Sequence, residues 1–182
     1  MLKDNFKHIN SIKIVTKKIH LKISFILITL LFFSSCNSQQ RTESEIFVIP
    51  KDYVGVVYIF FDQENGISTE YDYIKRRIYQ IPKSGILETQ FLPNYGATEM
   101  PLYYEEAIGE KKMNYLKKGE SLDSKEEKVV AWHQTGTARS DPYDENSKIV
   151  HFIKFYVCKP SELIALDIKS SQIDPVSLLS GP

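Results

Sequence analysis

Cysteine is scarce in this sequence: the 182 residues include only Cys36 and Cys158. Cys158 ends a strongly apolar segment, where we expect a buried free thiol that behaves as a small hydrophobic side chain. If Cys36 is modified, as argued below, Cys158 has no partner within the chain. A framework of disulfides is then excluded.

The sequence also lacks an excess of positive charge and the motifs of several enzyme classes. Six of its 23 basic residues and one of its 23 acidic residues lie in residues 1–35, so 17 basic and 22 acidic residues remain in the rest of the chain. That remainder has no cluster of lysine and arginine, which argues against nucleic acid as a partner. The glycine-rich nucleotide-binding motifs and the G-x-S-x-G motif of serine hydrolases are absent.

The longest apolar run, residues 23–33, is too short to cross a membrane. Eleven residues in a helix cover only about half of the ~30 Å hydrocarbon core. Lysines precede the run, and Ser34, Ser35 and Cys36 follow it. A basic segment, a short apolar segment and small residues are typical of a secretory signal peptide, which we predict over residues 1–35.

The end of this segment, Phe33-Ser34-Ser35-Cys36, resembles the lipobox of bacterial lipoproteins, although Phe33 replaces the usual leucine. The resemblance implies that Cys36 carries lipid and becomes the first mature residue, with the membrane as partner. The alternative is an ordinary secretion signal with a plain thiol at Cys36. Residues 36–44 are polar and predict a flexible tether. They lack an acidic patch, which favours an outer-membrane location facing the periplasm.

The rest of the chain has strand-like segments separated by turn signals. Residues 54–61 form the strongest of them and are apolar on both faces, as in the interior of a sandwich or barrel. We predict an all-β domain over residues 45–160, a single antiparallel β-sandwich or partly open barrel of about eight strands. A short helical or extended tail over residues 161–182 follows, with Ser161 as helix N-cap. We expect one pair of neighbouring strands, 76–81 and 86–91, to form a hairpin, and another, 102–107 and 113–116, to pair with each other. The strands expected besides 54–61 are residues 45–49, 76–81, 86–91, 102–107, 113–116, 129–135 and 149–158.

Two segments share an Ile-Pro pattern: Ile49-Pro50-Lys51-Asp52-Tyr53-Val54-Gly55 and Ile81-Pro82-Lys83-Ser84-Gly85-Ile86-Leu87. With these motifs the chain resembles a family of small bacterial envelope proteins of unknown function, often found behind lipoprotein signals. The resemblance covers roughly residues 45–158. It implies a β-domain and supplies no catalytic or binding residue.

Aromatic residues are the best candidates for a binding site. Trp132, His133 and Arg139 can form one wall of a pocket, in which the indole stacks on a ligand and the imidazole and the guanidinium bind polar groups. The alternative is a strand with Trp132 in the core and His133 facing solvent, since neighbouring strand residues point to opposite faces. Among the eleven tyrosines, the candidates for an exposed aromatic surface that binds sugars or peptides are Tyr95, Tyr103 and Tyr104.

These observations favour a lipid-anchored, non-enzymatic envelope protein that binds a protein partner or a polysaccharide. We expect no cofactor and no metal, because His133 and His151 alone do not provide the three or four ligands of a zinc site. The alternative function is an envelope hydrolase with His133 or His151 as general base, which requires an acid and a nucleophile within hydrogen-bond reach.

Overall fold

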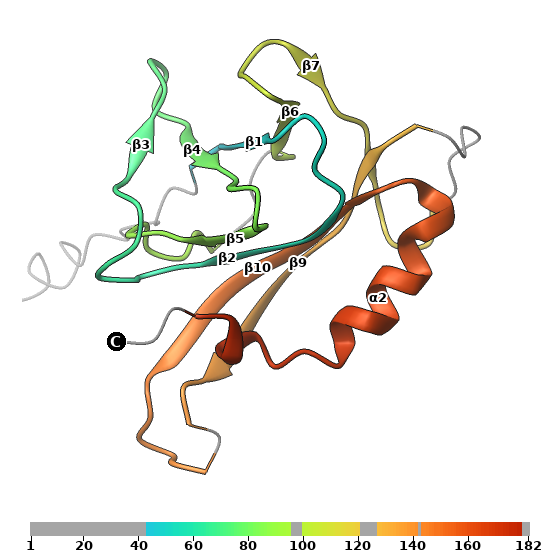
Figure 1. Ribbon diagram of the computed structural model, residues 1–182. Helices are drawn as coiled ribbons and strands as arrows, with labels where there is room; N and C mark the ends of the chain where they lie inside the picture. The colour runs from blue at the N-terminus through green and yellow to red at the C-terminus, as the bar shows by residue number, and fades with distance from the viewer. Residues whose placement is uncertain (1–42, 96–99, 121–126, 142, 180–182) are drawn as a thin grey trace, which may run out of the picture. The chain divides into compact units, whose positions relative to one another are not determined.

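The computed structural model describes residues 43–95, 100–120, 127–141 and 143–179 (Figure 1). The chain divides into two compact units, residues 1–41 and 42–182, and the described residues all belong to the second. The predicted signal peptide, Cys36 and most of the predicted tether lie outside the described residues. Among the helices of the described ranges, none combines the length and the apolar composition that a membrane span requires.

The described residues form ten strands in two five-stranded sheets, and a short helix follows near the C-terminus (Figure 1). The first sheet has the order β3-β4-β1-β6-β7, with bounds Glu70–Tyr71, Arg77–Gln80, Glu45–Ile49, Leu102–Glu105 and Lys111–Lys112. The second sheet has the order β5-β2-β10-β9-β8, with bounds Ile86–Glu88, Gly55–Phe60, Ile149–Cys158, Val129–Arg139 and Tyr115–Leu116. The helical segments are η1 (Pro160–Glu162), α2 (Leu163–Ser171) and η2 (Pro175–Leu178).

The two sheets enclose the main hydrophobic core, which confirms the predicted β-sandwich. Side chains alternate along each strand, so Val57 and Ile59 of β2 face the core between the sheets. Tyr58 and Phe60 point to the other face of the same sheet, where they belong to a second apolar cluster with Leu178 and others. Both faces of β2 are therefore covered, as its apolar sequence predicts.

The strand pairing is mixed rather than purely antiparallel. β1 is parallel to both of its neighbours, β4 and β6, and β2 is parallel to β5. The predicted hairpin between residues 76–81 and 86–91 is wrong, because the turn after β4 carries the chain into the second sheet, where β5 pairs with β2. Likewise β6 pairs with the short β7, while residues 115–116, predicted to pair with it, form β8 beside β9.

A β-bulge in β9 decides which way its side chains point. The register between β9 and β10 shifts so that Trp132 and His133 together lie opposite Phe155. Trp132 has a φ of 52°, a conformation that non-glycine residues rarely adopt. The extra residue reverses the alternation: His133 packs on Phe155 in the main core, and Trp132 lies on the outer face against Tyr156. This is the opposite of the predicted arrangement.

The C-terminal segment covers the outer face of the second sheet. Leu163 and Leu166 of α2 pack on an apolar cluster that includes Tyr156 and the fully buried Cys158. The helical conformation already begins at Pro160, whose fixed φ suits a first helical position, so Ser161 lies within η1 and is not the N-cap.

Candidate binding groove

The two Ile-Pro-Lys segments form equivalent turns at one edge of the sandwich. In the first, the Tyr53 backbone N–H donates to the Pro50 carbonyl at 3.0 Å. In the second, the Gly85 backbone N–H donates to the Pro82 carbonyl at 2.9 Å. Each is a four-residue β-turn that carries the chain from the first sheet into the second. The strand–turn–strand unit β1–β2 therefore lies beside a matching unit, β4–β5.

The register of the parallel strands brings the two turns side by side. Val48 of β1 is paired with Gln80 of β4, and the Ile81 N–H donates to the Val48 carbonyl at 2.9 Å. Both strands then continue into Ile-Pro-Lys, so Lys51 and Lys83 occupy corresponding positions in neighbouring turns. Both lysines are exposed. The carboxyl end of β6, the third parallel strand, meets them at the same edge.

A groove with a volume of about 720 Å³ lies at this edge, and we call it the twin-turn groove. It is lined by Val48, Pro50, Lys51, Asp52, Tyr53, Val54, Gln80, Ile81, Lys83 and Glu106.

Tyr53 and Gly85 hold the two turns together. The Tyr53 hydroxyl donates to the Val56 carbonyl at 2.6 Å, and burial raises the pKa of this phenol to about 12. Gly85 has a φ of 76°, and a β-carbon at this position would lie 1.9 Å from the Tyr53 hydroxyl oxygen. Only glycine therefore leaves room for the tyrosine of the first turn against the backbone of the second.

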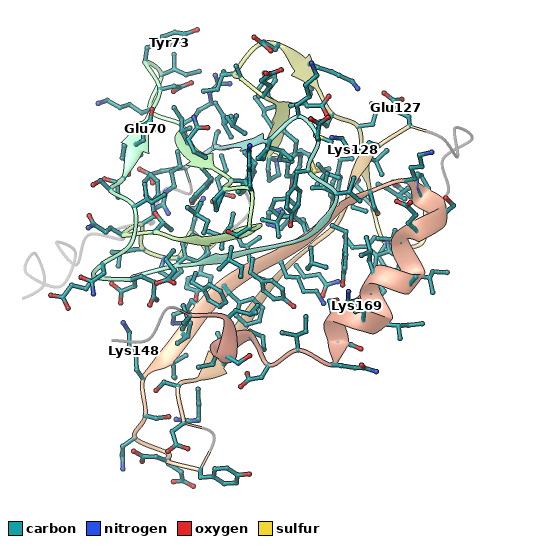
Figure 2. All side chains as sticks on the ribbon, viewed as in Figure 1. Glu70, Tyr73, Glu127, Lys128, Lys148 and Lys169 are labelled. Carbon is teal, nitrogen blue, oxygen red and sulfur yellow. The ribbon has the colours of Figure 1, made fainter. Side chains whose placement is uncertain are left out.

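An ion-pair cluster supports the first turn from the side of β6. The Lys128 ammonium donates to the Lys51 carbonyl and lies 2.5 Å from the Glu105 carboxylate, which Lys111 approaches at 3.4 Å. Burial opposes ionisation of Glu105, but the two lysines outweigh it and hold the pKa of this carboxyl below its ordinary value. Lys128, labelled in Figure 2, thus links the start of β9 to the turn.

The twin-turn groove offers donors and acceptors without a net charge. Lys51 and Lys83 supply ammonium groups, and Asp52 and Glu106 supply carboxylates. Val54, whose side chain is 56% exposed, adds an apolar contact. Such a lining suits a polar chain that carries both signs of charge.

The structure places Tyr103 in the core, so it cannot belong to an exposed aromatic surface. Its side chain is 1% exposed and stacks on Phe47 at 5.2 Å. Its hydroxyl is hydrogen-bonded to His133 Nδ1 at 2.6 Å. On β6, alternation turns Tyr103 to the core and Tyr104 to the outer face.

The other predicted binding residues lie in four different places. Tyr104 is half-buried on the outer face of the first sheet, and Trp132 lies on the outer face of the second. Tyr95 is 52% exposed, and its hydroxyl contacts the His151 ring. Arg139 ends β9, is exposed and donates to the Glu145 carbonyl at 2.5 Å. The structure does not bring these residues together into one site.

The two histidines are also apart. β9 and β10 are paired, but His151 lies opposite Thr137, four residues along β9 from His133. His133 is packed among aromatic rings with the Tyr103 hydroxyl as partner, and burial lowers its pKa to about 4. Within the ranges that the structure describes, no three or more histidine, cysteine or acidic side chains are grouped to hold a metal.

The residues that line the twin-turn groove are absent from the sequence-based candidates. The signal that identifies them is the tripeptide Ile-Pro-Lys, which occurs at residues 49–51 and again at 81–83, each time after an apolar strand. Only the parallel pairing of β1 and β4 shows that the two copies meet.

Comparisons with known proteins assign no activity to the chain. Residues 41–163 match the model of a family of unknown function, DUF6843, a range that includes both turns and all ten strands. None of the curated proteins compared with the chain matches it. A crystal structure described as "Putative Lipoprotein from Bacillus anthracis" is similar, with 18% identity over 66% of this chain and 73% of that chain and a TM-score of 0.46.

Proposed function

Because the chain belongs to the family of unknown function DUF6843, which brings no activity with it, we propose a function from the geometry of the twin-turn groove. The protein is a lipid-anchored, non-enzymatic module of the cell envelope that binds a segment of a partner protein in this groove. The observation that carries the proposal is the convergence of two matching Ile-Pro-Lys turns on one large groove.

The lining favours a protein segment over a polysaccharide. Sugar-binding sites commonly stack pyranose rings on exposed aromatic faces. The single aromatic residue among the groove's lining is Tyr53, and its ring is packed against the two turns. Lysines and carboxylates of both signs instead match the charged side chains and the backbone amides of a peptide.

The anchor is the lipid on Cys36, in the outer membrane and facing the periplasm. The state of the other cysteine supports Cys36 as the lipidated residue. Cys158 is fully buried, and burial raises the pKa of its thiol to about 11, so it is unsuited to modification. The described residues begin at Glu43, seven residues after Cys36.

Site-specific photocrosslinking in intact cells tests the groove. A benzophenone amino acid is introduced at Val54, at the groove, and in a control at Tyr143, which is 96% exposed between β9 and β10. We expect a protein adduct from position 54 only. The adduct should be lost in Lys51→Ala/Lys83→Ala and retained in Lys112→Ala/Lys169→Ala, two exposed lysines outside the groove.

Other results would contradict the proposal in distinct ways. An adduct that glycosidases degrade and proteases leave intact would make the ligand a polysaccharide. No adduct at position 54, or the same adduct at both positions, would remove the groove as a binding site. Binding of the identified partner to the purified protein, weakened by the groove lysine substitutions alone, completes the test.

A further inference from the structure

The chain enters the domain at a fixed point, next to the hairpin that joins β3 and β4. The Glu43 backbone N–H donates to the Asn94 side-chain oxygen at 3.2 Å, and the Glu43 carbonyl accepts from the Asn94 amide at 2.7 Å. The Glu43 carboxylate accepts from Arg77, at the start of β4, and from Tyr71 of β3 at 3.4 Å. Glu43 and Ser44, the last two residues of the predicted tether, are therefore hydrogen-bonded to the domain.

The turn of this hairpin, residues 72–76, is held by a single carboxylate, and we call it the β3–β4 tip. Asp72 accepts from the backbone N–H groups of Ile74 at 3.1 Å and Arg76 at 2.9 Å, and from the Arg76 guanidinium at 2.7 Å. The Lys75 N–H donates to the Asp72 carbonyl at 3.1 Å. The tip is thus a preorganised structure and not a loose loop.

This turn exposes apolar side chains to solvent. Tyr73 is 91% exposed and Ile74 is 55% exposed, and Leu92, whose carbonyl accepts from Arg77, is 60% exposed. Figure 2 shows Tyr73 at the outer end of the β3–β4 hairpin. Exposed tyrosine and aliphatic side chains on a rigid turn suit the boundary between water and lipid, where an aromatic ring is buried and its hydroxyl stays hydrated.

We propose that the β3–β4 tip inserts Tyr73 and Ile74 into the surface of the membrane that holds Cys36. Leu92, which contacts Arg77 at the base of the hairpin, adds to this apolar surface. This inference rests on the lipid anchor of the proposed function. Glu43 is the seventh residue after Cys36, so a fully extended chain between the two spans at most ~25 Å. The tip lies next to Glu43, so a lipid on Cys36 keeps it within reach of the bilayer.

Charge on the hairpin neither drives nor prevents this contact. Lys75 is exposed, Glu70 is exposed on β3, and Asp72 and Glu43 are paired with Arg76 and Arg77. Positive and negative groups therefore balance, and insertion depends on the apolar side chains. Binding through the tip should be as strong to vesicles of zwitterionic phosphatidylcholine as to vesicles with anionic lipid.

Insertion of the tip sets the direction in which the twin-turn groove faces. β1 and β4 run from the tip end of the first sheet to the groove end. Five residues of β1 at ~3.3 Å each place the groove ~16 Å or more beyond the tip end. The groove then faces away from the membrane, accessible to a partner in the aqueous compartment.

Tryptophan quenching by brominated lipid tests the tip. The mature full-length protein is reconstituted into vesicles of brominated phosphatidylcholine as wild type, with Trp132 as its single tryptophan, and as Tyr73→Trp and Tyr143→Trp. Tyr143 lies in the connection between β9 and β10, which Figure 1 shows at the opposite end of the view from the β3–β4 hairpin. We expect strong quenching of the added fluorescence in Tyr73→Trp, little in Tyr143→Trp, and loss of the effect when Ile74→Ser and Leu92→Ser are added.

The outcomes separate the tip from the anchor. Incorporation of a palmitate analogue, measured on the same protein, reports the lipid on Cys36. If the label is present and Tyr73→Trp is quenched no more than Tyr143→Trp, the tip inference is wrong and the anchor stands. If the label is absent, the same variants are added from solution to the brominated vesicles, which tests insertion of the tip without the anchor. Stronger quenching of Tyr73→Trp than of Tyr143→Trp then supports the tip inference, and equal quenching overturns it.

Discussion

At the scale of single residues, the twin-turn groove depends on the fit between Tyr53 and Gly85. The tyrosine belongs to the first Ile-Pro-Lys turn and the glycine to the second, thirty-two residues later along the chain. The pairing of β1 and β4 sets the register of the two turns, and this contact packs one turn against the other. A substitution at Gly85 therefore tests a tertiary contact as well as a backbone conformation.

Gly85→Ala should lower the free energy of unfolding by ~2–4 kcal/mol, because the positive φ and the overlap with Tyr53 add up. Gly109→Ala is the matched control, since its φ is 84° and a β-carbon there would meet nothing within 4 Å. It should cost only ~1 kcal/mol. Urea unfolding of both variants measures the difference. Equal losses of unfolding free energy would show that the close contact between Tyr53 and Gly85 adds nothing to the cost of the substitution.

His133 should make the fold less stable in acid. Burial lowers its pKa from 6.5 in the unfolded chain to about 4 in the folded state, so the unfolded state takes up the proton first. The contribution of this group is nil above pH 6.5, and stability falls as the pH drops from 6.5 towards 4, by ~3 kcal/mol in all. Urea unfolding at a series of pH values measures the slope of the unfolding free energy against pH.

The control for this prediction is the other histidine of the domain. His133→Asn should remove the extra slope between pH 6.5 and 4, and His151→Asn should retain it. Glu45, whose carboxyl pKa is raised by burial, contributes an opposite slope in all three proteins, so the comparison between them is informative. Identical slopes in both variants would rule out His133 as the source.

At the scale of the elements, α2 is the part of the fold that protects Cys158. Leu163, 3% exposed, belongs to the same apolar cluster as the fully buried cysteine. In a Cys36→Ala background, Leu163→Ala should accelerate the reaction of Cys158 with a thiol reagent, because the cover of the second sheet is weakened. Ile164→Ala, on the exposed side of the same helix, should leave the rate unchanged. Similar rates of Cys158 modification in both variants would mean that α2 does not protect this thiol from the reagent.

The elements also show where periodicity is informative and where it misleads. The period-two pattern of β2 correctly predicts which side chains face the main core. The same rule fails on β9, because the bulge at Trp132 and His133 adds one residue to one strand of the pair. Nothing in the local sequence marks this bulge, since a glycine would be the ordinary residue at the positive φ that Trp132 adopts.

At the scale of the whole domain, the two ends of the first sheet are the places to which we assign different roles. The chain enters beside the β3–β4 tip, and the twin-turn groove lies at the carboxyl ends of β1, β4 and β6. The parallel direction of these three strands creates this polarity, because equivalent ends meet at the same edge. A purely antiparallel sandwich would distribute its turns over both edges.

Removal of the anchor should abolish membrane attachment and leave the stability of the fold unchanged. Metabolic labelling with a palmitate analogue should mark the wild type and leave Cys36→Ala unlabelled, and Cys36→Ala should move to the soluble periplasmic fraction. Its unfolding midpoint should equal that of the wild type, because the described domain begins only at Glu43. Label on Cys36→Ala, or on neither protein, would contradict the assignment of the lipid to Cys36.

The sequence by itself determined the class of the fold and the positions of its main strands, and it predicts an export signal over residues 1–35. These depend on local features: hydrophobic periodicity, turn residues and the order of basic, apolar and small residues. The tertiary structure decided which sheet each strand joins, which face Trp132 and His133 occupy, and that two Ile-Pro-Lys turns meet in one groove. A turn that begins with Pro-Lys is compatible with a hairpin or with a crossing between sheets, and only the packing of strands that are distant in the chain selects one of them.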